Sequence, residues 1–185
     1  MIYHLSLQTA GLAAGLLLIF THAFTLFRPQ QTVAWAKSFP RSRGAATALL
    51  AIVGIWSFLL VQSIDLGEFS PLRNTMLLAI VAGAVLSWIY VPEFLAVRAL
   101  GMLLLLAAEP LLESAFLCHE TSRLLLVVLA YAWVIAGLFY VGMPYLLRDA
   151  IQWVTADRNR LKSGAIAGAV YGLALVACAL AFWRT

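Results

Sequence analysis

Five uncharged apolar runs, each long enough to cross a lipid bilayer, constrain the fold of this chain more than any other feature. They cover residues 5–27, 44–64, 74–92, 124–147 and 163–183. A hydrocarbon core about 30 Å thick requires about 20 apolar residues of helix. Helices satisfy their backbone hydrogen bonds within one segment, as lipid demands. The sequence therefore predicts an all-α, multi-pass membrane protein.

Residues 94–117 form a sixth run of similar length, which three charged residues interrupt: Arg98, Glu109 and Glu113. We count it as a sixth span because the charge distribution along the chain requires an even number of crossings. Hydrophobic residues make up 64% of the sequence and charged residues 11%, against about 45–50% and 25% in soluble domains. We expect residues 1–185 to form a single transmembrane domain, a six-helix bundle without a soluble domain.

The basic residues predict the orientation of this bundle. Most of them lie in two loops, residues 28–43 and residues 148–162. With six alternating helices these loops and Arg98 fall on one face, and only Arg73, Arg123 and Arg184 fall on the other. Basic residues favour the cytoplasmic side. We therefore expect a protein of the cytoplasmic (inner) cell membrane, with both loops in the cytoplasm and both termini outside.

Each cytoplasmic loop combines a tryptophan with a cluster of basic residues, which is typical of a segment at the membrane surface. The residues expected to meet the interface or anionic lipid are Trp35, Arg41, Arg43, Trp153, Arg158, Arg160 and Lys162. Residues 148–160 have an apolar helical face, so a short helix should lie on the inner surface. A loose internal duplication is an alternative explanation for the similarity of the two loops. Anionic lipids are expected partners, and nucleic acids are not.

Small residues at four-residue intervals predict where the helices pack, because small side chains let helix backbones approach each other in lipid. The first helix carries Gly11 and Gly15, and the third carries Gly83 between Ala79 and Ser87. The last helix carries Gly164, Gly168 and Gly172. These faces could join helices within the chain, or they could bind another membrane protein or a second copy.

The fourth span carries a polar stripe of Arg98, Glu109 and Glu113. The ten residues between Arg98 and Glu109 rise about 15 Å as a helix, about half the hydrocarbon thickness. Arginine can extend to the headgroups, whereas glutamate is too short. We therefore expect Glu109 to be submerged, and to be protonated, paired or exposed to a wet cavity, with Glu113 near the outer surface. Pro110 should loosen the helix beside it.

Three residues expected at the outer ends of neighbouring helices are candidate partners of Glu109: Arg73, His119 and Arg123. In one interpretation these contacts only hold the helices together. In the other, the stripe is part of a path for a proton, an ion or a small solute.

The sequence contains no recognisable catalytic motif. No zinc-protease histidine pair, nucleophile elbow or phosphate-binding glycine loop occurs. His4 and His119 could share a haem on the outer side, but hydrogen-bonded interfacial histidines explain the same residues. No catalytic residue, metal or cofactor is predicted.

These observations favour a non-enzymatic accessory or structural subunit of a larger membrane complex. The alternative is a small-solute, ion or proton-coupled transporter that uses Glu109. A third hypothesis is a membrane enzyme or redox protein that acts on a lipid or a quinone.

Overall fold

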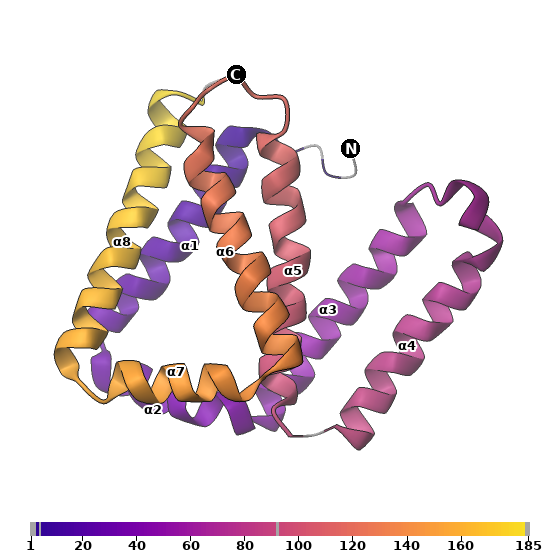
Figure 1. The fold of residues 1–185 in the computed structure, drawn as a ribbon, viewed down its shortest axis with the longest axis horizontal. Coiled ribbons are helices and arrows are strands. Elements are labelled where there is room, and N and C mark those ends of the chain that lie inside the picture. Colours follow the sequence, from indigo (N-terminus) through magenta and orange to yellow (C-terminus); the bar gives the residue numbers. More distant parts are fainter. Residues whose placement is uncertain (1–2, 4, 92, 184–185) are drawn as a thin grey trace.

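The computed structural model describes residues 3, 5–91 and 93–183, and these residues form helices and no strand. Figure 1 shows their arrangement. In chain order the elements are α1 (Leu7–Phe27), α2 (Pro29–Ser38), η1 (Phe39–Arg41), α3 (Arg43–Ser63), η2 (Gly67–Leu72), α4 (Arg73–Tyr90), α5 (Leu95–Ala115), α6 (Arg123–Gly142), α7 (Tyr145–Thr155) and α8 (Arg158–Ala181).

Six helices in the described part of the chain are long and apolar enough to cross a membrane, as predicted, and they fit a multi-pass membrane protein. They are α1, α3, η2 with α4, α5, α6 and α8. The fifth span is shorter than expected, because α6 ends at Gly142 rather than at residue 147. The apolar residues that follow belong to α7.

Local sequence explains where several helices begin. Ser6 accepts a hydrogen bond from the Thr9 amide at the start of α1, and Ser42 accepts one from the Ala45 amide at the start of α3. Asp157 caps α8 in the same way. Such side-chain acceptors satisfy amides that have no partner within the helix. α2 begins with Pro29, a residue suited to the first helical turn because it has no amide hydrogen to satisfy.

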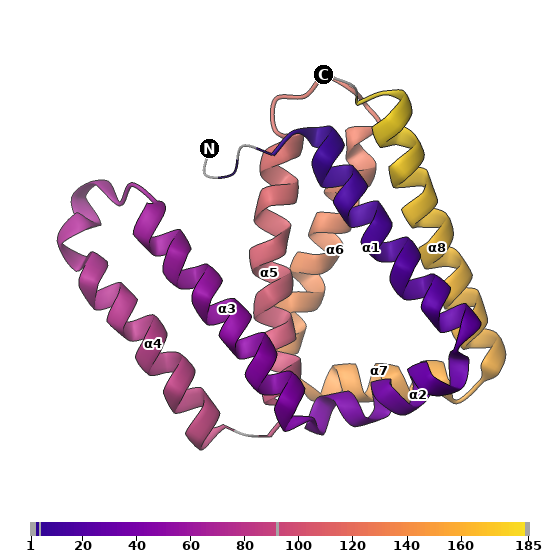
Figure 2. The same ribbon diagram turned by 180° about the vertical axis from the view of Figure 1, so that it is seen from behind.

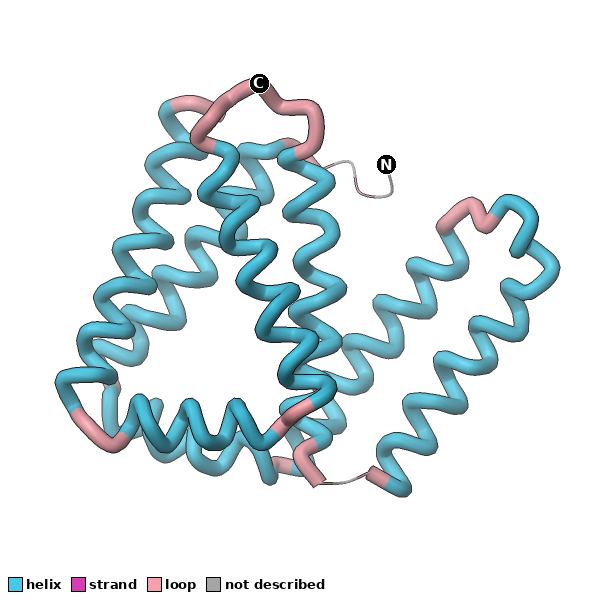
Figure 3. The backbone as a smooth tube through the Cα atoms, viewed as in Figure 1, coloured by secondary structure: helices cyan, strands magenta, loops and turns pink. Residues whose placement is uncertain are grey.

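The two ends of the molecule differ in construction (Figures 1 and 3). α1 begins and α8 ends at one end, which we call the terminal end. At the other end, α2 and α7 lie side by side across the ends of the spans, as Figure 2 also shows. We call this the α2–α7 end. The structure thus contains a second short helix across the ends of the spans, α2, which was not predicted from the sequence.

Two helix pairs pack closely through glycine. In the α1–α8 pair, a Cβ atom on Gly15 would lie 2.9 Å from the Gly172 carbonyl oxygen, and one on Gly172 would lie 2.9 Å from that of Gly15. In the α5–α6 pair, Gly101 and Gly137 face each other in the same reciprocal way at 2.8 Å. No side chain larger than hydrogen fits such contacts, so both backbone approaches depend on glycine.

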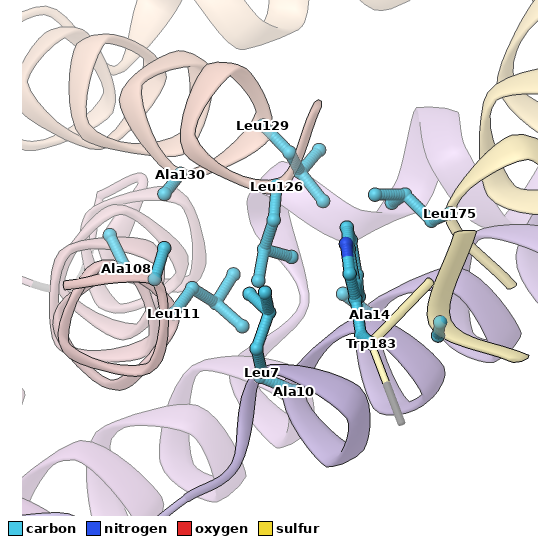
Figure 4. Close-up of a cluster of buried hydrophobic side chains, with 12 residues drawn as sticks. Leu7, Ala10, Ala14, Ala108, Leu111, Leu126, Leu129, Ala130, Leu175 and Trp183 are labelled. Carbon is cyan, nitrogen blue, oxygen red and sulfur yellow. The ribbon is translucent and has the colours of Figure 1, made fainter. Parts of the chain in front are cut away.

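The larger apolar cluster lies at the terminal end and joins α1, α5, α6 and α8 (Figure 4). Trp183, which follows α8, is only 2% exposed and belongs to this cluster. Its indole nitrogen donates a hydrogen bond of 2.8 Å to the Ser122 hydroxyl, and its ring packs against Gly11. The last described residue of the chain therefore holds three helices together.

A second apolar cluster lies at the α2–α7 end, where Phe39 of η1 packs with residues of α3 and α5. α5 contributes to both clusters. In its most apolar 18-residue stretch 44% of the residues are buried, the largest share among the spanning helices. α4 is the opposite case, with no buried residue. It packs on α3, which also contacts α5 at the α2–α7 end, and from there the α3–α4 hairpin diverges from the other spans (Figures 1 and 2).

Candidate functional site

Glu109 lies in a shallow recess on the side of α5. The recess has a volume of about 550 Å³, within the range of roughly 300–1,000 Å³ that is typical of small-ligand sites. Apolar side chains of α5 and Val134 of α6 form most of its lining, together with Glu109 and Glu113. Within the described residues Glu109 makes no hydrogen bond or ion pair. The Glu109 carboxyl group therefore lines a mostly apolar recess and has no partner among the described residues.

The three residues considered as partners of Glu109 are occupied elsewhere or lie outside the bundle. Arg73 donates to the Ile64 carbonyl at 2.8 Å, and Arg123 donates to the Ala115 carbonyl at 2.7 Å. His119 is exposed in the connection between α5 and α6. Both arginines bind carbonyl groups at helix ends, which lack partners within their helices. In the described structure neither arginine forms an ion pair with Glu109.

Glu113 has a different environment from Glu109. It is half-buried, and its carboxylate accepts a hydrogen bond of 2.9 Å from the Tyr3 amide. The Tyr3 hydroxyl in turn accepts a hydrogen bond of 2.7 Å from the Trp56 indole of α3, and the two rings meet edge to face. The segment before α1 thus connects α5 to α3 at the terminal end. Glu113 forms part of this connection rather than an exposed end of the helix.

Arg98 lies on α5 near the second apolar cluster and does not line the recess of Glu109. It is half-buried, and its Nε atom is buried without a hydrogen-bond partner among the described residues. The sequence placed Arg98, Glu109 and Glu113 on one stripe. The structure brings the two glutamates to one recess and leaves Arg98 at the opposite half of the helix.

A second apolar hollow lies between α3 and α4. This hairpin groove, of about 370 Å³, is floored by the small residues Ala51, Gly54 and Ala84 and is flanked by larger apolar side chains. Its two polar side chains satisfy each other, because the Trp88 indole donates to the Thr47 hydroxyl at 3.2 Å. The groove therefore offers shape and apolar surface, but no unsatisfied polar group.

The glycines proposed for packing fall into two groups. Gly11, Gly15, Gly168 and Gly172 lie at contacts between α1 and the C-terminal segment, with Gly168 against the His22 ring. Gly83 and Gly164 have no atom of another residue near the position of a Cβ. Sequence reasoning missed the close pair Gly101 and Gly137, because neither belongs to a repeat of small residues at four-residue intervals.

The predicted interface residues lie at the α2–α7 end. Trp35 and Trp153 are exposed on α2 and α7, and the Arg160 guanidinium lies 4.6 Å from the centre of the Trp153 ring. Arg43 and Arg158 are the first residues of α3 and α8, and both are exposed. Lys162 is exposed one turn into α8, and Arg41 ends η1 beside α7.

The histidines do not come together in the described structure. His22 lies half-buried on α1, where its Nδ1 atom is 2.8 Å from the Leu18 carbonyl oxygen. His119 lies at the opposite end, and the haem hypothesis also involves His4, which is outside the described residues. The described residues contain no group of three or more histidine, cysteine or carboxylate side chains that could hold a metal ion.

Comparison with known proteins gives no family for this chain. No family model matches it, and no curated protein and no solved structure is significantly similar to it.

Proposed function

We propose that this protein is a non-enzymatic subunit of a larger membrane assembly and that the α3–α4 hairpin binds the partner. The observation that carries the proposal is the isolation of α4. The span that contains α4 has no buried residue in its most apolar 18-residue stretch, although this span is as long as the well-packed spans. Its half-buried residues face α3, so the rest of the helix is open to another protein.

The hairpin groove suits a helix of another membrane protein. In lipid, helices associate where small residues allow close approach, because apolar surface alone gives no advantage over lipid tails. Ala51, Gly54 and Ala84 form such a floor, and Gly83 on α4 also has free space above it. The partner we infer is therefore a transmembrane helix with an apolar, closely packing face.

Gly54→Leu tests this proposal directly. A Cβ atom at Gly54 meets nothing within 4 Å, so the leucine should fill the groove without displacing this chain's own side chains. After mild detergent extraction, native mass spectrometry should find a stable heteromer with the wild-type protein and loss of the partner with Gly54→Leu. Gly164→Leu, which also enters open space but on α8, should retain the partner.

Two results would contradict the proposal. One is a wild-type protein that is a monomer or a homodimer under the same extraction conditions. The other is a heteromer that survives Gly54→Leu and Gly83→Leu as well as it survives Gly164→Leu.

A second candidate function is a proton-coupled or small-solute transporter. Glu109, which makes no hydrogen bond or ion pair with the described residues, favours it. A carboxyl group in hydrocarbon is costly, about 2.5–3.5 kcal/mol on insertion scales, so its retention points to a use. In liposomes with an entrapped pH-sensitive dye and a potassium gradient, the purified protein should carry protons. Glu109→Gln should abolish this flux, whereas Glu93→Gln, in the exposed connection before α5, should not. Equal flux from wild type and Glu109→Gln would remove Glu109 from any such mechanism.

The orientation that accompanies both candidate functions places the α2–α7 end in the cytoplasm and the protein in the cytoplasmic membrane. The excess of basic residues at the α2–α7 end supports this orientation.

A further inference from the structure

A polar pocket at the α2–α7 end gathers side chains from four separate segments. It has a volume of about 370 Å³, which falls in the range of small-ligand sites. Its lining includes Lys37 of α2, Arg41 of η1, Phe94 just before α5, and Arg148 and Gln152 of α7. Residues distant in the sequence therefore meet here because α2 and α7 lie side by side (Figures 1 and 2). We call this the basic pocket.

Positive charge dominates the basic pocket. Lys37, Arg41 and Arg148 line it, and no carboxylate does. Arg148 pairs with Asp149, whose Oδ1 atom accepts a hydrogen bond of 2.8 Å from Nε and forms an ion pair of 2.8 Å with Nη2. In the part of the chain that the structure describes, Lys37 and Arg41 have no such partner. Two unneutralised cations and an amide side chain thus share one cavity.

An aromatic ring lies beside one of the cations of the pocket. The Arg148 guanidinium lies 6.0 Å from the centre of the Phe94 ring, within cation–π range. Phe94 adopts a left-handed backbone conformation with φ of 56°, which is uncommon for a bulky residue. α5 begins directly after Phe94 without a side-chain cap. The positive end of the helix dipole therefore lies at the edge of the pocket.

We propose that the basic pocket binds a phosphate group, and that this phosphate belongs to an anionic lipid headgroup. Arginine and lysine are the usual donors to phosphate, and arginine can bind it in a bidentate manner. The exposed Trp35, on the same helix as Lys37, is a residue type that prefers headgroup depth. Lipid phosphates are concentrated at that depth, which favours them over a soluble phosphate ester. This inference is independent of the partner proposed for the α3–α4 hairpin.

The site can be distinguished from general attraction between a basic surface and anionic lipid. Arg28 and Arg158 line a wider recess of about 830 Å³ at the same end, with no residue in common with the basic pocket. The double variant Lys37→Gln/Arg41→Gln and the double variant Arg28→Gln/Arg158→Gln therefore remove the same charge from the same end. Only the first removes charge from the basic pocket.

The experiment measures retention of phosphatidylglycerol by the full-length protein at graded lipid concentrations, by native mass spectrometry. Phosphatidylcholine with the same acyl chains is the neutral comparison. Lys37→Gln/Arg41→Gln should weaken phosphatidylglycerol binding about tenfold or more, since each lost charge-assisted hydrogen bond contributes of that order. Arg28→Gln/Arg158→Gln should change it less than about twofold, because neither residue lines the basic pocket. Lys37→Arg/Arg41→Lys, which keeps the charge, should restore binding and exclude misfolding as the cause.

A competition arm identifies the source of the phosphate. Inorganic phosphate and glycerol 3-phosphate should not displace phosphatidylglycerol at millimolar concentration. If either does so, and the same double variant abolishes its effect, the pocket binds phosphate but the lipid assignment is overturned. Equal losses in the two double variants, or equal retention of phosphatidylglycerol and phosphatidylcholine, would overturn the site itself.

Discussion

At the scale of single residues, the charged side chains near the terminal end are distinguished by what satisfies them. Arg73 and Arg123 bind carbonyl oxygens at the ends of α3 and α5. Such carbonyls attract cations, because they carry the negative end of the helix dipole. Glu113 binds the Tyr3 amide. Glu109 faces a mostly apolar recess and makes no hydrogen bond or ion pair with the described residues.

The close contact between Gly15 and Gly172 gives the first prediction at this scale. Gly172→Leu should destabilise the protein, because the new side chain would meet the Gly15 carbonyl at 2.9 Å and must separate α1 from α8. Overpacking of this kind costs about 1–3 kcal/mol. The loss should appear as a lower midpoint of thermal unfolding in detergent.

Gly164→Leu is the matched control, since it makes the same substitution on the same helix at a position with free space. It should leave the midpoint nearly unchanged. Equal destabilisation by Gly172→Leu and Gly164→Leu would mean that the α1–α8 contact does not hold the fold together.

At the scale of elements, hydropathy predicts the spanning helices well but does not predict where a helix turns. The apolar run that begins at residue 124 continues to residue 147, yet α6 ends at Gly142 and Pro144 precedes α7. Leu146 and Leu147 are apolar because they form the half-buried face of α7. Composition cannot separate these two roles, because the direction of a helix is not part of a hydropathy average.

The prediction of the α2–α7 end was incomplete for a related reason. The sequence analysis expected one surface helix near residues 148–160, and α7 covers Tyr145–Thr155. α2 was missed, because Pro29–Ser38 is short and its residues are mostly polar or small. The basic pocket could not be predicted, since Lys37 and Arg148 meet only through the packing of these two helices.

At the scale of the whole molecule, the spans form two close pairs and a projecting hairpin rather than one closed bundle (Figure 1). Pairing was partly accessible from the sequence, because Gly11, Gly15, Gly168 and Gly172 mark the contact of α1 with the C-terminal segment. The isolation of α4 was not accessible. The span that contains α4 is as long as the spans that pack well and is the least apolar of the six, so its isolation is seen only in its contacts in space.

The orientation of the whole molecule gives the last prediction. Cys118 and Cys178 are replaced by alanine, and Ser38→Cys at the end of α2 or Ser70→Cys in η2 provides a single exposed thiol. The two positions lie at opposite ends of the molecule, because α3 separates them. The basic residues favour the cytoplasm for the α2–α7 end. In intact cells a membrane-impermeant maleimide should therefore label Ser70→Cys and leave Ser38→Cys unlabelled until the membrane is permeabilised. Labelling of Ser38→Cys in intact cells would reverse the orientation and place the basic pocket outside, where a cytoplasmic anionic lipid could not reach it.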